Sequence, residues 1–203
     1  MEQYLDAKIK RFVQKKLFNK VTKVKTMLGL GGLHPEKYLE VVPEHRNCVL
    51  VDFNLVNALV RRNSLIGEFD LLTDSPAERS PLNFVDCDFC RSIINNGADL
   101  IYIYNKMQLS SVRNKYITFT FSCRGIGDYG TVEWLSNNFP ELNIPKDYVF
   151  LNDSRCKEVG YRQYVKRMYD PSREQFLDIY KYRDSGDNMI AGLIKILWWV
   201  FEN

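Results

Sequence analysis

Glycines and an aspartate at the ends of two predicted strands form the clearest candidate ligand site. Gly29, Gly31 and Gly32 follow one apolar segment, and Asp52 ends the next, about 20 residues later. Glycines after a strand let the backbone approach a ligand closely, and a following helix presents free N–H groups. An acid on the next strand can accept hydrogen bonds from both ribose hydroxyls. Each feature alone is a common turn or helix cap, but their order predicts a nucleoside-binding site.

The glycine spacing argues against a dinucleotide as the ligand. The dinucleotide fingerprint is G-x-G-x-x-G, and counting from Gly29 its sixth position is His34. We therefore disfavour an NAD-dependent reductase.

Two segments resemble the first motifs of class I S-adenosylmethionine-dependent methyltransferases: MLGLGGLHPEKYLEVV and NCVLVDFN. The C-terminal FLDIYKYRDSGDNMIAGLIKILWW resembles the last two strands of that family. The resemblance implies S-adenosylmethionine as the cofactor. Met27 departs from the family pattern, which has an acid two positions before the first glycine; backbone carbonyls would replace it. The implied cofactor-binding residues are Gly29, Leu30, Gly31, Gly32, Asp52, Phe53, Asp70 and Asp86.

A second motif, Asp86-Cys87-Asp88-Phe89, ends another predicted strand. In class I methyltransferases, which these segments resemble, this position faces the transferred methyl group. Members that methylate amino groups carry Asp/Asn-Pro-Pro-aromatic there. The resemblance implies Asp86, Asp88 and Phe89 as catalytic residues, although the prolines are missing. The alternative is that Asp86 caps a helix and Phe89 packs in the core. Cys87 and Cys90 form a C-x-x-C pair, but without a second pair we predict no metal site.

Basic residues are concentrated at the start of the chain. The first 25 residues contain only two acids, Glu2 and Asp6, and the following bases: Lys8, Lys10, Arg11, Lys15, Lys16, Lys20, Lys23 and Lys25. Such a patch can attract phosphates even when the net charge is only +3. A second basic segment, 155–167, includes Arg155, Lys157, Arg162, Lys166 and Arg167. The alternative is a solvated helix face.

These bases favour nucleic acid over protein or a small molecule as the methyl acceptor. The candidate substrate-binding residues are Lys15, Lys16 and Arg124, which follows a predicted strand. A methyltransferase-like subunit that has lost catalysis and serves as a scaffold is the alternative, favoured by Met27 and the missing prolines.

The elements that would position these residues alternate along the chain. Helical spacing predicts helices over 2–20, 35–42, 54–62, 132–139 and 154–169, and a helical or mixed segment over 91–108. Strands are predicted over 21–30, 47–53, 69–73, 82–86 and 116–122, followed by a hairpin of 176–182 and 189–200. We expect one α/β domain, 1–203, beginning with a basic helix over 1–20. It would be a three-layer sandwich with a mostly parallel central sheet and a C-terminal antiparallel hairpin strand.

Composition places the chain among globular proteins, with 45% hydrophobic and 26% charged residues. Five cysteines without a secretory leader indicate free thiols in a reducing compartment, so we expect a cytoplasmic protein. We predict no membrane partner, because the apolar C-terminal run is too short and contains Lys195. The high Asn, Lys and Tyr content is typical of virus-encoded proteins, which would act in a host cell. The acceptor atom and the oligomeric state stay open.

Overall fold

The computed structural model describes residues 2–22, 27–30, 48–51, 83–109, 112–152, 165–184 and 186–197. The helices are α1 (Glu2–Phe18), α4 (Ile93–Leu109) and α5 (Gly127–Asn138), with a 3₁₀ turn η1 (Pro140–Leu142). The first strands are β1 (Met27–Leu30), β2 (Cys48–Val51), β3 (Phe84–Ser92) and β4 (Asn114–Ser122). The later strands are β5 (Val149–Leu151), β6 (Val165–Asp170), β7 (Gln175–Asp184) and β8 (Asp187–Leu197).

The described strands form one sheet in the order β2-β1-β3-β4-β8-β7-β6-β5. The three pairings among β2, β1, β3 and β4 are parallel. The four pairings from β4 through β8, β7 and β6 to β5 are antiparallel. The expectation of a mostly parallel sheet was therefore wrong: the sheet is mixed, and antiparallel pairings outnumber parallel ones. The predicted C-terminal hairpin is confirmed as β7 and β8.

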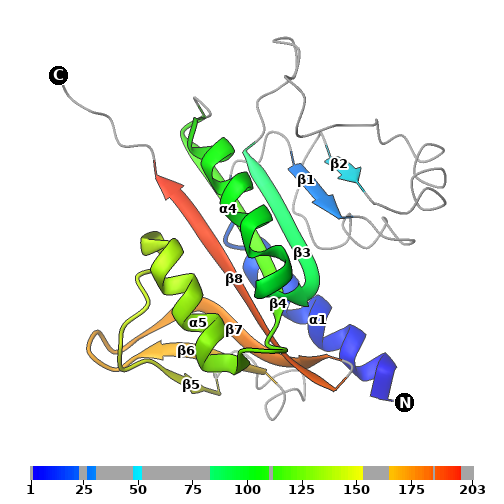
Figure 1. Ribbon diagram of the computed structural model, residues 1–203, viewed down its shortest axis with the longest axis vertical. Coiled ribbons are helices and arrows are strands. Elements are labelled where there is room, and N and C mark those ends of the chain that lie inside the picture. Colours follow the sequence, from blue (N-terminus) through cyan, green and yellow to red (C-terminus); the bar gives the residue numbers. More distant parts are fainter. Residues whose placement is uncertain are drawn as a thin grey trace.

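Helices cover both faces of this sheet, so the three-layer arrangement is present (Figure 1). Ile9, Val13 and Leu17 recur at helical spacing and bury one side of α1 against the first face. The other face packs on α4 and α5 through the second core cluster, which includes Phe119 and Leu135. Side chains alternate along each strand, so every polar strand residue can be assigned to the α1 face or to the α4 and α5 face.

The predicted helix over 154–169 was wrong at its C-terminal end, because 165–169 belongs to β6. The remainder of that segment, 153–164, lies outside the described residues. Along β6, Val165 is buried and Lys166 is exposed, as in an ordinary strand. Arg167, however, is only 2% exposed, so a residue type typical of surfaces occupies a core position. This hid the alternation of the strand in the sequence, and it removes Arg167 from the basic face predicted for 155–167.

Two element boundaries also differ from the expectation near the candidate site. The strand predicted over 82–86 continues to Ser92 as β3, with an irregular register between Asp88 and Ser92. Helix α5 begins at Gly127 rather than at residue 132. Gly125 and Gly127 have φ values of 91° and 70°, and these left-handed conformations suit glycine in the tight turn between β4 and α5.

Candidate active site at the carboxyl edge of the parallel strands

The carboxyl ends of β1, β2, β3 and β4 lie at one edge of the sheet, because these strands are parallel. Ligands of open α/β sheets bind outside this edge. The predicted cofactor residues Gly31, Gly32, Asp52 and Phe53 follow β1 and β2 in the sequence, but they lie outside the described residues. Asp70 does as well. The described part of the candidate site is therefore built from β1, β3, β4 and α1.

Gly29 and Asp86 are brought together by the register of two neighbouring strands. Gly29 is buried in β1 and is paired with Leu50 of β2 on one side and Asp86 of β3 on the other. Neighbouring strands lie about 4.8 Å apart. The Asp86 side chain is only 3% exposed and accepts a 2.7 Å hydrogen bond from the Thr118 hydroxyl on β4. Leu30 is the last residue of β1, and its side chain lies outside the description.

Asp88 lies two residues further along β3, and so on the same face as Asp86 and closer to the carboxyl edge. Its carboxylate forms a 2.7 Å ion pair with Lys10 of α1, and the two side chains are 13% and 21% exposed. This contact fixes α1 against the candidate site. Lys10 did not stand out in the sequence, because it is one of many bases in the same helix.

Phe89 and Cys87 are on the opposite face of β3. Phe89 packs against the α4 and α5 core and stacks on Phe121, with ring centroids 5.3 Å apart. Cys87 is buried, and burial, followed by the nearby Asp86 carboxylate, raises the pKa of its thiol well above the ordinary value. A thiol of this kind stays protonated and unreactive at neutral pH. Of the three predicted catalytic residues, Asp86 and Asp88 share a face, and Phe89 does not.

Arg124 follows β4 at the same edge of the sheet, where a surface pocket of about 320 Å³ lies between α5 and the β7–β8 turn. Its guanidinium forms a 2.6 Å ion pair with Asp187, and its side chain is 71% exposed. Arg183 and Asp128 also line the pocket. Burial would raise the pKa of Asp128, but hydrogen bonds from Lys181 and Cys123 lower it below its ordinary value. The pocket thus carries charges of both signs.

The remaining predicted substrate residues, Lys15 and Lys16, lie in the last turn of α1. Lys15 is exposed, whereas Lys16 is partly buried, with its ammonium 5.2 Å from the centroid of the Phe12 ring. Both residues follow Lys10, the residue of α1 that contacts Asp88, towards the C-terminal end of the helix. Within the described ranges, no three His, Cys, Asp or Glu residues gather as they would around a metal ion.

The fold matches that of a known methyltransferase structure. The N-methyltransferase NodS from Bradyrhizobium japonicum superimposes with a TM-score of 0.54, covering 98% of this chain and 100% of that one at 10% sequence identity. The chain has the class I methyltransferase fold. A second structure, an S-adenosylmethionine-dependent methyltransferase from Clostridium acetobutylicum, gives a TM-score of 0.36 at 13% identity, covering 96% of this chain and 73% of that one.

No family model and no curated protein sequence matches this chain significantly. Among the described helices, none is both long enough and apolar enough to span a bilayer.

Proposed function

We propose that this protein is an S-adenosylmethionine-dependent methyltransferase whose acceptor is a nucleic acid. The observation that carries the proposal is the pairing of Gly29 with Asp86 on adjacent parallel strands, at the edge where this fold accommodates ligands. The likeness to NodS, an N-methyltransferase, supports the same reaction class. Bound S-adenosylmethionine would supply an electrophilic methyl group on its sulfonium.

The residues at this edge fit the groups of that cofactor. Gly29, Leu30, Gly31 and Gly32 would approach its amino-acid part through the backbone, because glycine leaves room for close contact. The carboxylate of Asp52 would accept hydrogen bonds from the ribose hydroxyls. Asp86 and Asp88 add negative charge on one face of β3, which complements a cationic sulfonium. Phe53 and Asp70 complete the proposed set.

Asp86 and Asp88 are the proposed acid–base residues. The Thr118 hydroxyl orients the Asp86 carboxylate, and Lys10 holds the Asp88 carboxylate. A carboxylate in either position can accept the proton that an attacking nitrogen or oxygen loses. Arg124, at the neighbouring pocket, would hold a phosphate of the acceptor after releasing Asp187.

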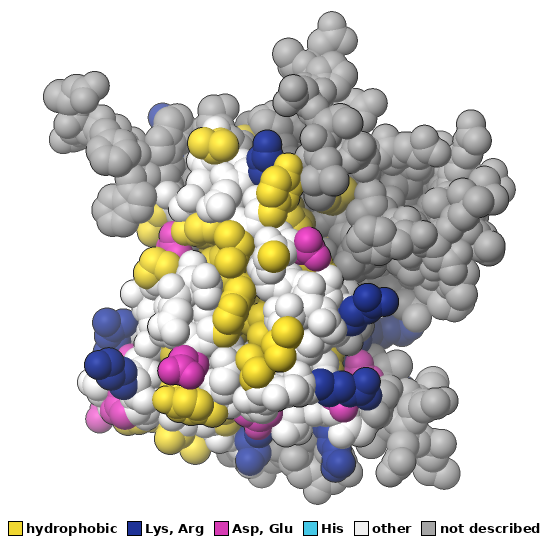
Figure 2. Space-filling model, in the orientation of Figure 1, with side chains coloured by type: hydrophobic (Ala, Val, Ile, Leu, Met, Phe, Trp, Pro, Cys, Tyr) yellow, Lys and Arg dark blue, Asp and Glu magenta, His cyan; other side chains and the backbone are white. Residues whose placement is uncertain are grey.

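The charge on α1 favours a nucleic-acid acceptor. Residues 8–22 contain six basic residues and no acid. α1 crosses its face of the sheet from Lys10, beside Asp88, towards Lys20 at the far end, so a polyanion lying along Lys15 and Lys16 would lead to the candidate site. The opposite face differs: Figure 2 shows apolar side chains gathered over α4 and α5, where Ile94, Tyr102 and Tyr129 are exposed.

The second candidate function is a scaffold subunit without catalysis. Two observations favour it, and the first is that the Lys10 ammonium already pairs with Asp88, a proposed catalytic carboxylate. Met27 stands where the family has an acid, and it is fully buried on the α1 face of β1. A scaffold would bind nucleic acid through α1 without transferring a methyl group.

A thermal-shift panel separates these functions. We expect S-adenosylmethionine and S-adenosylhomocysteine to stabilise the protein by about 2.7 kcal/mol at a hundredfold excess over Kd, and NAD to give no shift. Transfer of a labelled methyl group should then be assayed with nucleic-acid, protein and small-molecule pools. Stabilisation by NAD alone would contradict the proposal. Cofactor binding without any acceptor in the three pools would favour the scaffold.

A further inference from the structure

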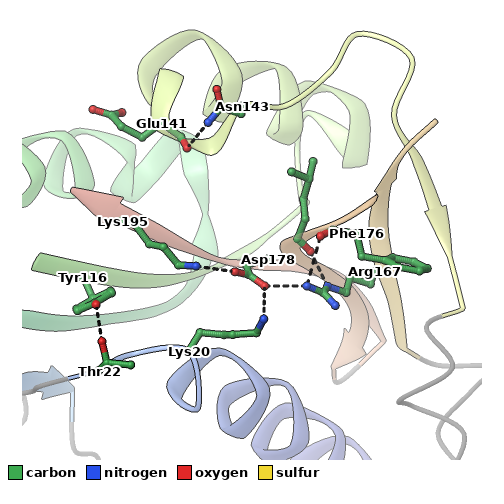
Figure 3. Close-up of polar contacts among 10 residues, drawn as sticks. Lys20, Thr22, Tyr116, Glu141, Asn143, Arg167, Phe176, Asp178 and Lys195 are labelled. Atoms are coloured by element: carbon green, nitrogen blue, oxygen red, sulfur yellow. Dashed lines mark hydrogen bonds and ion pairs between the residues drawn. The ribbon is translucent and has the colours of Figure 1, made fainter. Parts of the chain in front are cut away.

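Three cations surround a single carboxylate at the end of α1 farthest from the candidate active site. Asp178 of β7 is contacted by Arg167 of β6 at 2.8 Å, Lys195 of β8 at 3.2 Å and Lys20 after α1 at 3.8 Å (Figure 3). Three different parts of the chain therefore bring positive charge to one point, and one carboxylate cannot balance it.

Arg167 is buried and its guanidinium bonds to neighbouring parts of the sheet. Its side chain is 3% exposed, and its Nε donates a 2.6 Å hydrogen bond to the carbonyl of Leu177. The guanidinium carbon also lies 5.6 Å from the Phe176 ring centroid and 5.4 Å from that of Tyr180. Because this buried guanidinium is also the closest cation to Asp178, it balances the negative charge of that carboxylate.

Among the described residues, Lys20 and Lys195 therefore add positive charge beyond the amount that balances Asp178. Their side chains are 39% and 46% exposed, and they contact different oxygens of the same carboxylate. This geometry places the two ammonium groups within reach of one phosphate from the solvent side. A hollow of about 200 Å³ lies beside Lys195, and its charged lining residues are Lys195, Arg173, Asp178 and Glu141.

We propose that Lys20 and Lys195 form a second phosphate-binding point, so that the acceptor is a polynucleotide strand running along α1 rather than a mononucleotide. This inference rests on the proposed function. Helix α1 rises about 12 Å from Lys10 to Phe18, and Lys20 follows in the turn after it. With phosphates about 3.4 Å apart along one strand of a duplex, that rise covers roughly four of them.

An acidic membrane surface fits these observations less well. A basic amphipathic helix binds a membrane by inserting its apolar face between the lipids. The apolar residues Ile9, Val13 and Leu17 of α1 are 0–2% exposed and pack against the sheet. From Lys8 to Phe18, the exposed side chains of α1 are basic, which favours a ligand that offers a row of phosphates.

The test compares K20Q/K195Q with a control of equal charge change, K106Q/K146Q. Lys106 is exposed on α4, and Lys146 is exposed in the loop between η1 and β5. Fluorescence anisotropy would measure binding of fluorescein-labelled oligouridylates of 4 and 12 nucleotides between 50 and 200 mM salt. For the 12-mer we expect K20Q/K195Q to weaken binding roughly tenfold and to reduce the log–log salt slope by about 0.7, the value for one phosphate contact on a single strand. Binding of the 4-mer should change by less than about twofold, because α1 alone can hold it.

Equal losses in K20Q/K195Q and the control would overturn the inference, as would equal wild-type affinities for the 4-mer and the 12-mer. It would also be overturned if K20Q/K195Q reduced binding to phosphatidylserine vesicles but not to the 12-mer, which would identify a membrane surface instead. S-adenosylhomocysteine binding, measured by calorimetry on the same samples, separates the two proposals. If S-adenosylhomocysteine does not bind but K20Q/K195Q still weakens binding of the 12-mer, the methyltransferase proposal is contradicted. The proposed phosphate-binding point is then still supported.

Discussion

Asp86→Asn is expected to lower the turnover number by roughly 10²–10⁴-fold while leaving the affinity for S-adenosylhomocysteine, which lacks the sulfonium charge, nearly unchanged. Asparagine keeps the shape of the side chain and an oxygen that can accept the hydrogen bond from Thr118, but it removes the negative charge. A general base cannot accept a proton after this change, whereas cofactor binding through backbone groups is not affected by it. The measurement is transfer of a labelled methyl group at saturating cofactor.

Thr118→Val is the matched control for Asp86→Asn. It removes the hydroxyl that orients Asp86 and keeps the carboxylate, so we expect a loss of about tenfold or less. Full turnover in Asp86→Asn would show that Asp86 is not the base. Asp88→Asn would then be the next variant, since Asp88 lies on the same face and nearer the carboxyl edge.

Arg167→Met is expected to lower the free energy of unfolding by about 3 kcal/mol, the lower part of the range for breaking a buried ion pair. Methionine can fill the space between Phe176 and Tyr180, but it cannot donate hydrogen bonds to the Leu177 carbonyl or to Asp178. Lys20 and Lys195 still contact Asp178, which limits the loss. Urea unfolding measures the difference.

Arg173→Met provides the comparison for this stability prediction. Arg173 also pairs with an aspartate, Asp170, but its side chain is 59% exposed. Exposed ion pairs contribute about 0–1 kcal/mol. If the two variants were equally stable, the buried guanidinium would not be holding β6 and β7 together.

The parallel half of the sheet could be predicted because its strands are bordered by helices and glycine turns. The segments 21–30 and 47–53 contain β1 and β2, and the segments 82–86 and 116–122 overlap β3 and β4. The hairpin of β7 and β8 was also predictable, from the turn residues between two apolar runs. β5 has only three residues, two of them exposed, which is too short for periodicity to detect. β6 was missed because the buried Arg167 disguised its pattern.

From the sequence, only the order of the candidate site residues along the chain could be predicted. The order of Gly29, Asp52 and Asp86 indicated a shared edge, and the register confirms that Gly29 and Asp86 are neighbours. The contacts of Thr118 and Lys10 depend on strand pairing and on the position of α1, which local sequence does not encode. Phe89 lies on the opposite face from Asp86 and Asp88 because β3 extends through it and the side chains of a strand alternate.

The central claim is that this chain binds S-adenosylmethionine through the edge formed by β1, β2 and β3. Isothermal titration with S-adenosylhomocysteine tests it most directly, using the wild type, Asp52→Ala and the exposed-site control Asp147→Ala. We predict binding by the wild type and the control, and a loss of about 1.5–3 kcal/mol in Asp52→Ala, the range for a hydrogen bond to a charged group. No binding by the wild type at millimolar ligand, or wild-type affinity in Asp52→Ala, would contradict the account.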